Sequence, residues 1–138
     1  KKQNEKKNLK ILIDNCQLNK KINLHGYKNN LLKYYKKADL YVNASHIEGF
    51  STSIIDAINF NLGVIASDCK GGNREILLNG KGGDLFKVND YYELAKKIKN
   101  FFEKPNTLLN KNIKDKKNIS NFSELNNLKA YEKIFKKI

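Results

Sequence analysis

Arginine is almost absent from this chain, although the chain is strongly basic. Of its 27 basic residues only Arg74 is an arginine and the other 26 are lysines, and the net charge is +13. Proteins that read nucleic-acid sequence depend on arginine for bidentate contacts and gather their charge on one face. Here lysine, asparagine and isoleucine are abundant along the whole length, as in the products of AT-rich genes. The composition therefore argues against a nucleic-acid partner and favours peripheral contact with an anionic membrane surface.

Cysteine, histidine and long apolar runs are also scarce. Cys16 and Cys69 lie far apart and form no CxxC pair, so we expect buried thiols in a reducing compartment, with neither a disulfide nor a metal site. His25 and His46 have no metal-ligand spacing either. No apolar run approaches the roughly 18 residues of a membrane span, and we recognise no signal peptide. These absences predict a soluble, cytoplasmic protein.

The size and composition of the chain are those of one globular domain. Its 138 residues are enough for a core but short for a complete two-domain enzyme, and 40% of them are hydrophobic. We find no internal repeat. We expect a partial domain over residues 1–105, followed by a C-terminal helical tail of the same domain over residues 106–138.

Helical and extended apolar patterns alternate along the chain. We expect helices over about 4–18, 31–35, 54–61, 74–78 and 91–102, and strands over 21–25, 40–44, 63–67 and 84–88. This alternation predicts a Rossmann-like α/β fold, with a parallel sheet and helices on both faces. Such sheets commonly have about six strands, so the domain is expected to lack its first strands.

Polar residues mark several predicted helix ends. The hydroxyls of residues 51–53 are placed to cap the helix that follows them. Asn61 tolerates the left-handed conformation at the end of that helix. Asp90 can cap the helix over residues 91–102.

The loop over residues 45–52 carries the residues most suited to chemistry. It joins a strand to a helix, and ligands of parallel sheets bind beyond the carboxyl ends of the strands. The unpaired N–H groups of a helix start are a natural seat for a diphosphate. Gly49 lets the backbone come close to such a ligand, and Ser51 and Thr52 add hydroxyl donors.

Two carboxylates flank this helix start. Glu48 precedes the turn, and its carboxylate could accept hydrogen bonds from the hydroxyls of a sugar. Asp56 lies about one helical turn further on, where it could accept from a ribose. Spacing alone leaves open that one acid is a cap and the other a surface residue.

Five segments in order resemble a known family. They are ADLYVNAS (38–45), EGF (48–50), DAI (56–58), GVIASDC (63–69) and GNREIL (72–77). Together they look like the C-terminal, donor-binding domain of GT-B glycosyltransferases, specifically the retaining group 1 enzymes of the family 4 type. The resemblance runs from about residue 21 to residue 102.

This resemblance implies roles for individual residues. The acid–seven residues–acid motif of the family falls on Glu48 and Asp56, so Glu48 would bind the donor sugar and align its anomeric centre, and Asp56 would bind the ribose. Backbone amides near Phe50, Ser51 and Thr52 would hold the diphosphate.

Four further residues are candidate donor or base contacts. Gly26 and Tyr27 follow the predicted strand over 21–25, where such enzymes often contact the base. His46 and Arg74 are also candidates, with a structural histidine and a surface pair of Arg74 with Glu75 as the alternatives.

The sequence departs from the family pattern in the same region. The second acid is usually glutamate, so Asp56 is one methylene shorter, and Ser51 stands where proline or glycine is common. Asn61 replaces a frequent glycine and Gly63 a frequent proline. These departures allow an atypical or slow enzyme.

The function implied by the resemblance is transfer of a hexose or N-acetylhexosamine from a nucleotide diphosphate sugar to a glycan or lipid-linked acceptor, with retention. No Asp-x-Asp metal loop is present, so we expect no metal or other cofactor; helix dipole and amides would stabilise the leaving diphosphate. The acceptor would need a missing N-terminal domain, so this chain alone is expected to be inactive or weak. The expected setting is bacterial cell-surface polysaccharide biosynthesis at the inner face of the cytoplasmic membrane.

The alternative is a non-catalytic, basic Rossmann-like module that docks on membrane or nucleic acid.

Overall fold

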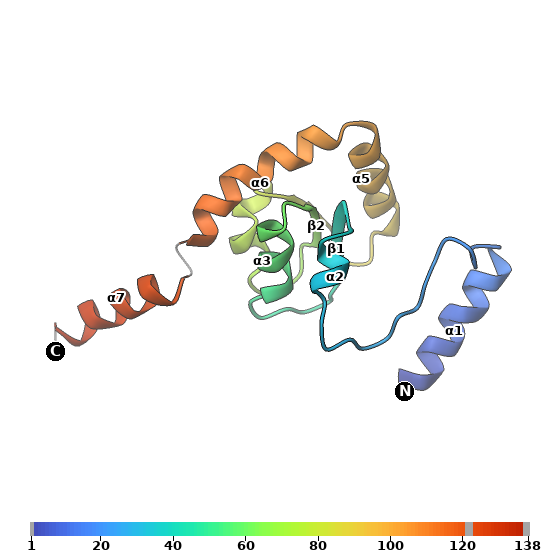
Figure 1. Cartoon of the computed structure of the whole chain (residues 1–138), viewed down its shortest axis with the longest axis horizontal. Helices are drawn as coiled ribbons and strands as arrows, with labels where there is room; N and C mark the ends of the chain where they lie inside the picture. The colour runs from blue at the N-terminus through green and yellow to red at the C-terminus, as the bar shows by residue number, and fades with distance from the viewer. Residues whose placement is uncertain (1, 121–122, 137–138) are drawn as a thin grey trace. The chain divides into compact units, whose positions relative to one another are not determined.

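Three parallel strands, in the order β1-β2-β3, form the sheet of this protein (Figure 1). The computed structural model describes residues 2–120 and 123–136. The strands are β1 (Leu40–Asn43), β2 (Gly63–Ser67) and β3 (Asp84–Phe86). Every residue of the central strand β2 is buried. This is the pattern of a strand with a neighbour on each side and helices over both faces.

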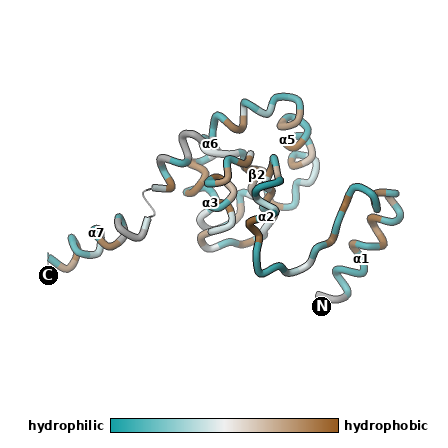
Figure 2. The backbone as a smooth tube through the Cα atoms, viewed as in Figure 1, coloured by the Kyte–Doolittle hydropathy of each residue, from teal (hydrophilic) through white to brown (hydrophobic). Residues whose placement is uncertain are grey.

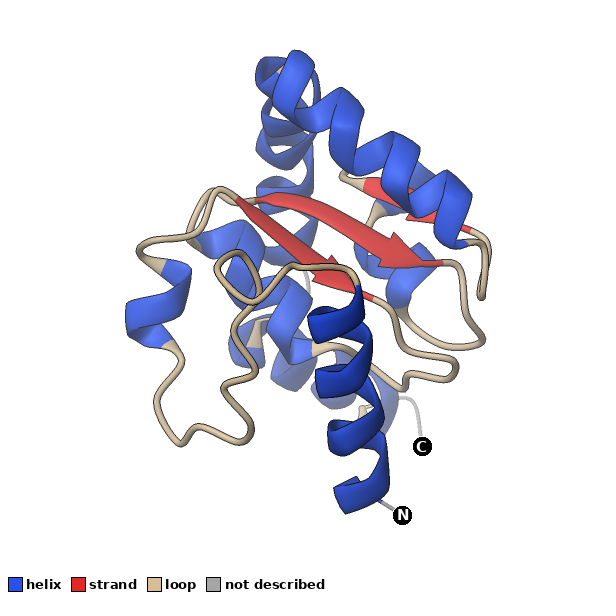
Figure 3. Cartoon of the chain, turned by 90° about the vertical axis from the view of Figure 1, so that its right-hand side faces the viewer, coloured by secondary structure: helices blue, strands red, loops and turns tan. Residues whose placement is uncertain are grey.

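Helices cover both faces of the sheet (Figure 3). On one face, Val64 and Ala66 of β2 pack with residues from α2, α3 and α4. On the other face, Ile65 packs with residues from α5 and α6, because side chains alternate between the faces of a strand. The helices are α2 (Leu32–Tyr35), α3 (Thr52–Asn59), α4 (Asn73–Ile76), α5 (Tyr91–Glu103), α6 (Pro105–Ile119) and α7 (Glu124–Phe135), and a short 3-10 turn covers Leu78–Gly80. The predicted α/β fold is confirmed.

The helix α6 is part of this core. Its Leu108 is 4% exposed and packs with Phe86 and Phe101. Hydrophobic and hydrophilic residues alternate along α5 and α6 (Figure 2), as expected of helices that bury one face. Within the described residues, no helix combines the length and the apolarity that crossing a bilayer requires.

Residues 1–31 form a separate unit from residues 32–138. The first unit contains α1 (Lys2–Asn15), which ends before Gln17, a residue with a φ of +56°. The expected burial of Cys16 is wrong, because this thiol follows the helix end and is exposed, whereas Cys69 is buried as expected.

The predicted strand over residues 21–25 is wrong. Residues 22–28 have no regular secondary structure, and Ile22 and Leu24 are 42% and 37% exposed. A strand exists only where its backbone groups pair with a neighbouring strand. Here the N–H groups of Lys21 and Ile22 instead donate to the Leu18 carbonyl, at 2.9 and 3.0 Å. The alternating sequence therefore follows a turn, and the described chain has no strand there.

Two predicted helix ends are confirmed. Asp90 caps α5 by accepting from the Glu93 N–H at 2.8 Å. Asn61 has a φ of +62° just after α3.

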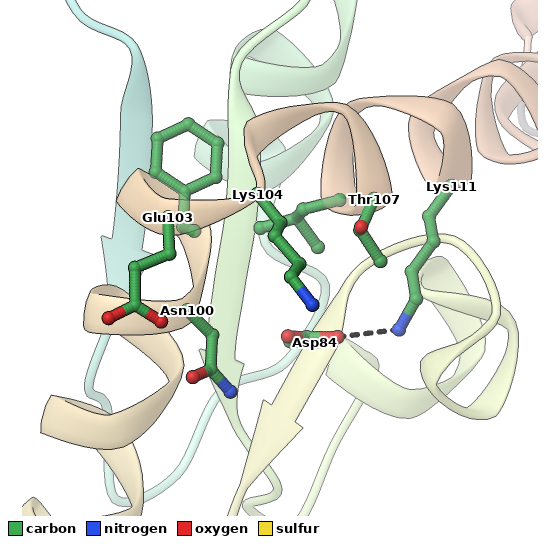
Figure 4. A pocket seen from close by; sticks show the side chains of 8 residues that line it. Asp84, Asn100, Glu103, Lys104, Thr107 and Lys111 are labelled. Atoms are coloured by element: carbon green, nitrogen blue, oxygen red, sulfur yellow. Dashed lines mark hydrogen bonds and ion pairs between the residues drawn. The ribbon is translucent and has the colours of Figure 1, made fainter.

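A hollow of about 300 Å³ lies beside the first residue of β3 (Figure 4). There the Lys111 ammonium donates to an Asp84 carboxylate oxygen at 2.6 Å and to the Gly80 carbonyl at 3.2 Å. These contacts attach α6 to β3. The hollow adjoins the amino end of the strand, whereas the predicted ligand loops follow the carboxyl ends.

Candidate functional site

The loops that follow β1 and β2 lie side by side. Ile47 forms an isolated parallel bridge with Lys70. The Glu48 N–H donates to the Lys70 carbonyl at 3.2 Å, and the Gly72 N–H donates to the Gly49 carbonyl at 2.6 Å. The backbone at Glu48 and Gly49, two of the predicted donor-binding residues, is therefore held by the loop after β2.

This approach of the two loops requires glycine at two positions. A Cβ atom at Gly71 would lie 1.4 Å from the Glu48 carbonyl oxygen, and Gly71 has a φ of +127°. A Cβ atom at Gly72 would lie 2.7 Å from the Gly49 carbonyl oxygen. The sequence indicated a turn at these glycines but not that they determine where Glu48 lies.

Buried polar side chains join the strand ends to these loops. The Asn43 side-chain oxygen accepts from the Ser45 N–H at 3.1 Å, and the Ser67 hydroxyl donates to the Ser45 carbonyl at 2.6 Å. The Asn73 side-chain amide donates to the Ser67 carbonyl at 3.0 Å. Sequence reasoning missed Asn43, Ser67 and Asn73; for Asn43 and Ser67 the signal was a polar residue at the end of an apolar strand.

The hydroxyl of Ser51 does not cap α3, so its predicted capping role is wrong. Ser51 occupies the N-cap position and is 1% exposed, but its side chain bonds to no helix N–H. Instead it accepts from the Asn43 side-chain amide at 3.4 Å and lies 3.2 Å from the Ser53 hydroxyl. The hydroxyl therefore interacts with two side chains and with none of the helix amides.

The first amides of α3 are consequently unoccupied. The N–H groups of Ile54 and Ile55 donate to the Ser51 carbonyl at 3.1 and 3.4 Å. In the described part of the chain, no backbone carbonyl or capping side chain accepts from the N–H groups of Thr52 and Ser53. An uncapped helix start carries a partial positive charge and free donors, which suit an anion.

The two predicted acids flank this helix start. Glu48 is half-buried in the loop, and Phe50, two residues later, is 43% exposed. Asp56 is exposed on α3 and lies near Tyr35 of α2: burial raises the pKa of Tyr35, and the nearby Tyr41 and Asp56 raise it further. Direct contact of Glu48 and Asp56 with a ligand stays a prediction.

Arg74 is paired with Asp68, not with Glu75. Its guanidinium donates to an Asp68 carboxylate oxygen, and this hydrogen bond and the opposite charge raise the pKa of Arg74. The arginine side chain remains 57% exposed. Asp68 directly follows β2, so the pair lies at the carboxyl edge of the sheet.

The remaining candidates are accessible, and their contact with a ligand stays a prediction. His46 is exposed in the loop after β1. Gly26, with a φ of +65°, and Tyr27, 91% exposed, belong to the first unit. Among the described side chains, no group of three or more His, Cys, Asp or Glu residues could hold a metal ion. The absence of a metal requirement remains a prediction.

The chain resembles known proteins in sequence and in structure. Residues 2–122 match the family model described as Glycosyl transferases group 1. The chain is 32% identical over 98 residues to N-acetylgalactosamine-N,N'-diacetylbacillosaminyl-diphospho-undecaprenol 4-alpha-N-acetylgalactosaminyltransferase of Campylobacter jejuni, which covers 71% of this chain and 27% of that protein.

Two solved structures have the same fold. A glycosyltransferase from Rickettsia africae superposes with a TM-score of 0.81 at 30% identity, over 97% of this chain and 36% of that one. Anabaena Alr3699/HepE in complex with UDP superposes with a TM-score of 0.86 at 20% identity, over 99% and 38%. The chain thus spans between 27% and 38% of the length of these three relatives. It belongs to the group 1 family of glycosyl transferases and has the Rossmann-like fold of a GT-B C-terminal domain.

Proposed function

We propose that this chain binds the donor of a glycosyltransferase reaction, in which a hexose or N-acetylhexosamine passes from a nucleotide diphosphate sugar to a glycan or lipid-linked acceptor with retention. Family membership supports the reaction class. The observation that carries the site is the uncapped start of α3 directly after the loop that holds Glu48.

The start of α3 is suited to the diphosphate of such a donor. The free N–H groups of Thr52 and Ser53 and the helix dipole attract a diphosphate. A Cβ atom at Gly49 would meet no atom of the described chain within 4 Å, so a ligand can approach the backbone there. These groups would stabilise the charge that develops on the leaving diphosphate, and we therefore propose that no metal ion or other cofactor is needed.

The acids and Arg74 supply the other contacts in this proposal. Glu48 accepts hydrogen bonds from donor-sugar hydroxyls and aligns the anomeric carbon. Asp56 accepts from the ribose, directly or through a water because its side chain is short. Arg74, oriented by Asp68, presents its remaining N–H groups to an anionic part of the donor.

The named relatives favour particular substrates. One superposed structure contains UDP, and the Campylobacter jejuni relative is named as transferring N-acetylgalactosamine to a diphospho-undecaprenol-linked sugar. We therefore propose a UDP-sugar donor and a lipid-linked acceptor, with the acceptor bound by sequence outside this chain. The lysine-rich surface would favour contact with anionic lipids at the cytoplasmic face of a bacterial membrane during surface-polysaccharide synthesis.

Calorimetric titration of the chain with UDP, GDP and their N-acetylhexosamine and hexose conjugates tests this proposal. Glu48→Ala should weaken binding of the cognate nucleotide sugar about tenfold while leaving free UDP little changed, because only the sugar contact is lost. Asp56→Ala should weaken both ligands by a similar factor, because both contain the ribose. Asn59→Ala, an exposed residue later in α3, is the matched control and should bind like the wild type.

Wild-type affinity in both acid variants would contradict the assigned contacts. An absence of binding to every nucleotide, together with salt-sensitive binding to RNA or anionic vesicles, would instead support a non-catalytic basic module.

A further inference from the structure

Asn43 is a buried polar residue beneath the loop that carries Glu48. It is the last residue of β1, pairs in register with Ala66 of β2, and is 7% exposed. A buried amide costs free energy unless both its oxygen and its nitrogen find partners. The identity of those partners therefore shows what Asn43 does.

The two hydrogen bonds of Asn43 reach the two ends of residues 45–51. Its oxygen accepts from the Ser45 N–H at 3.1 Å, and its nitrogen donates to the Ser51 hydroxyl at 3.4 Å. Since a backbone N–H requires an acceptor, the bond to Ser45 fixes the amide orientation and leaves the NH₂ group facing Ser51. The Ser51 oxygen must then act as an acceptor toward Asn43.

This bond opposes the usual behaviour of a serine at the N-cap. Such a serine ordinarily turns its hydroxyl over the helix and accepts from the second or third amide. Ser51 has the N-cap position, yet its hydroxyl is held between Asn43 and Ser53, and α3 has no side-chain cap among the described residues.

We propose that Asn43 is a positioning residue that engages the Ser51 hydroxyl, so that this hydroxyl accepts from no amide of α3 and the Ser53 amide stays available to the donor diphosphate. The role in binding rests on the proposed function; the effect on the helix start does not. Asn43 acts through Ser51, because it is buried below the loop and bonds to both loop ends.

A double-mutant cycle on ligand affinity tests this role. Calorimetry with UDP and with inorganic pyrophosphate would compare the wild type, Asn43→Ala, Ser51→Ala and the double variant. Asn43→Ala should weaken both ligands about tenfold, because the released hydroxyl competes for the amides. The double variant should bind both ligands as tightly as Ser51→Ala alone does, because Asn43→Ala can cost affinity only while the Ser51 hydroxyl is present to compete. Rescue by removal of a second side chain is not expected of a general packing defect.

Amide hydrogen exchange of Ser53, followed by NMR without ligand, gives a second readout. Exchange should slow in Asn43→Ala and return to the wild-type rate in the double variant. Asn43→Leu, which keeps the number and branching of the side-chain heavy atoms, should behave in the same way and replaces Asn43→Ala if that variant does not fold.

Unchanged Ser53 exchange, or a loss of affinity that persists in the Ser51→Ala background, would overturn the proposal for Asn43. If the wild type binds neither UDP nor pyrophosphate, the proposed donor site fails, while the Ser53 exchange rates still decide whether Asn43 controls the helix start.

Discussion

Gly71 is constrained by a residue of another loop, because the Glu48 carbonyl occupies the space that a side chain would need. We predict that Gly71→Ala lowers the free energy of unfolding by more than about 3 kcal/mol, since it combines backbone strain with a clash against backbone. The variant should also weaken nucleotide binding, because the clash displaces Glu48. Urea unfolding and calorimetric titration measure the two effects.

Gly80 provides the matched control for this substitution. It has a φ of +89°, but a Cβ atom there would meet nothing within 4 Å in the described chain. Gly80→Ala therefore carries the strain without the clash and should cost about 1 kcal/mol. Equal losses of unfolding free energy in Gly71→Ala and Gly80→Ala would show that the nearby Glu48 carbonyl does not exclude a side chain at residue 71.

Residues whose conformation or hydrogen bonds depend on residues close in the sequence could be predicted from it. The cap at Asp90 and the left-handed conformation of Asn61 are of this kind. The bonds of Asn43 and Ser67 could not be predicted, because their partners are chosen by the packing of the loops after β1 and β2. The same packing explains why Ser51 fails as a cap although its residue type and position are favourable.

At the scale of elements, α5 is joined to the loop before it by two hydrogen bonds of Glu93. Asp90 accepts from the Glu93 N–H at 2.8 Å, and the Glu93 carboxylate accepts from the Lys87 N–H at 2.9 Å. We predict that Asp90→Ala lowers the free energy of unfolding by about 1 kcal/mol, measured by urea denaturation, because one helix N–H loses its acceptor. Asp90→Asn keeps a hydrogen-bond acceptor and should lower the free energy of unfolding by only a few tenths of a kcal/mol. A loss in the asparagine variant as large as in the alanine variant would mean that charge, not capping, is what Asp90 contributes.

The strands and helices that pack on one another were the predictable elements. Those from α2 to α6 combine apolar periodicity with a partner, and Ile65 and Val64 show the alternation that assigns each face of β2. The predicted strand over 21–25 had the same alternation, yet the described residues form no strand there. Periodicity describes which side chains could be buried, whereas strand formation also requires a second strand at the right place.

At the scale of the whole molecule, the division at residue 31 was not predicted. The lysines that raise the net charge occur on both sides of it, so charge does not mark the division. The fold class was predictable because it depends on the order of elements, and the family resemblance depended on five short segments between residues 38 and 77.

The final prediction separates donor binding from transfer. Rapid transfer requires the donor and the acceptor to be held in a reactive geometry, which can account for several powers of ten in rate. This chain spans 36% of the superposed Rickettsia africae glycosyltransferase, and the proposed site contacts only the donor. We therefore predict that the chain binds a UDP-sugar but turns it over slowly, even with a lipid-linked sugar present. The rate at which UDP is cleaved from the donor should be at least about a thousandfold below the roughly 10 s⁻¹ of a typical enzyme.

Calorimetry measures donor binding, and an assay of the UDP formed by the same preparation measures turnover. Glu48→Ala should not lower the residual turnover rate. Turnover near one per second that disappears in Glu48→Ala would contradict the prediction, because these 138 residues would then align the acceptor as well as the donor.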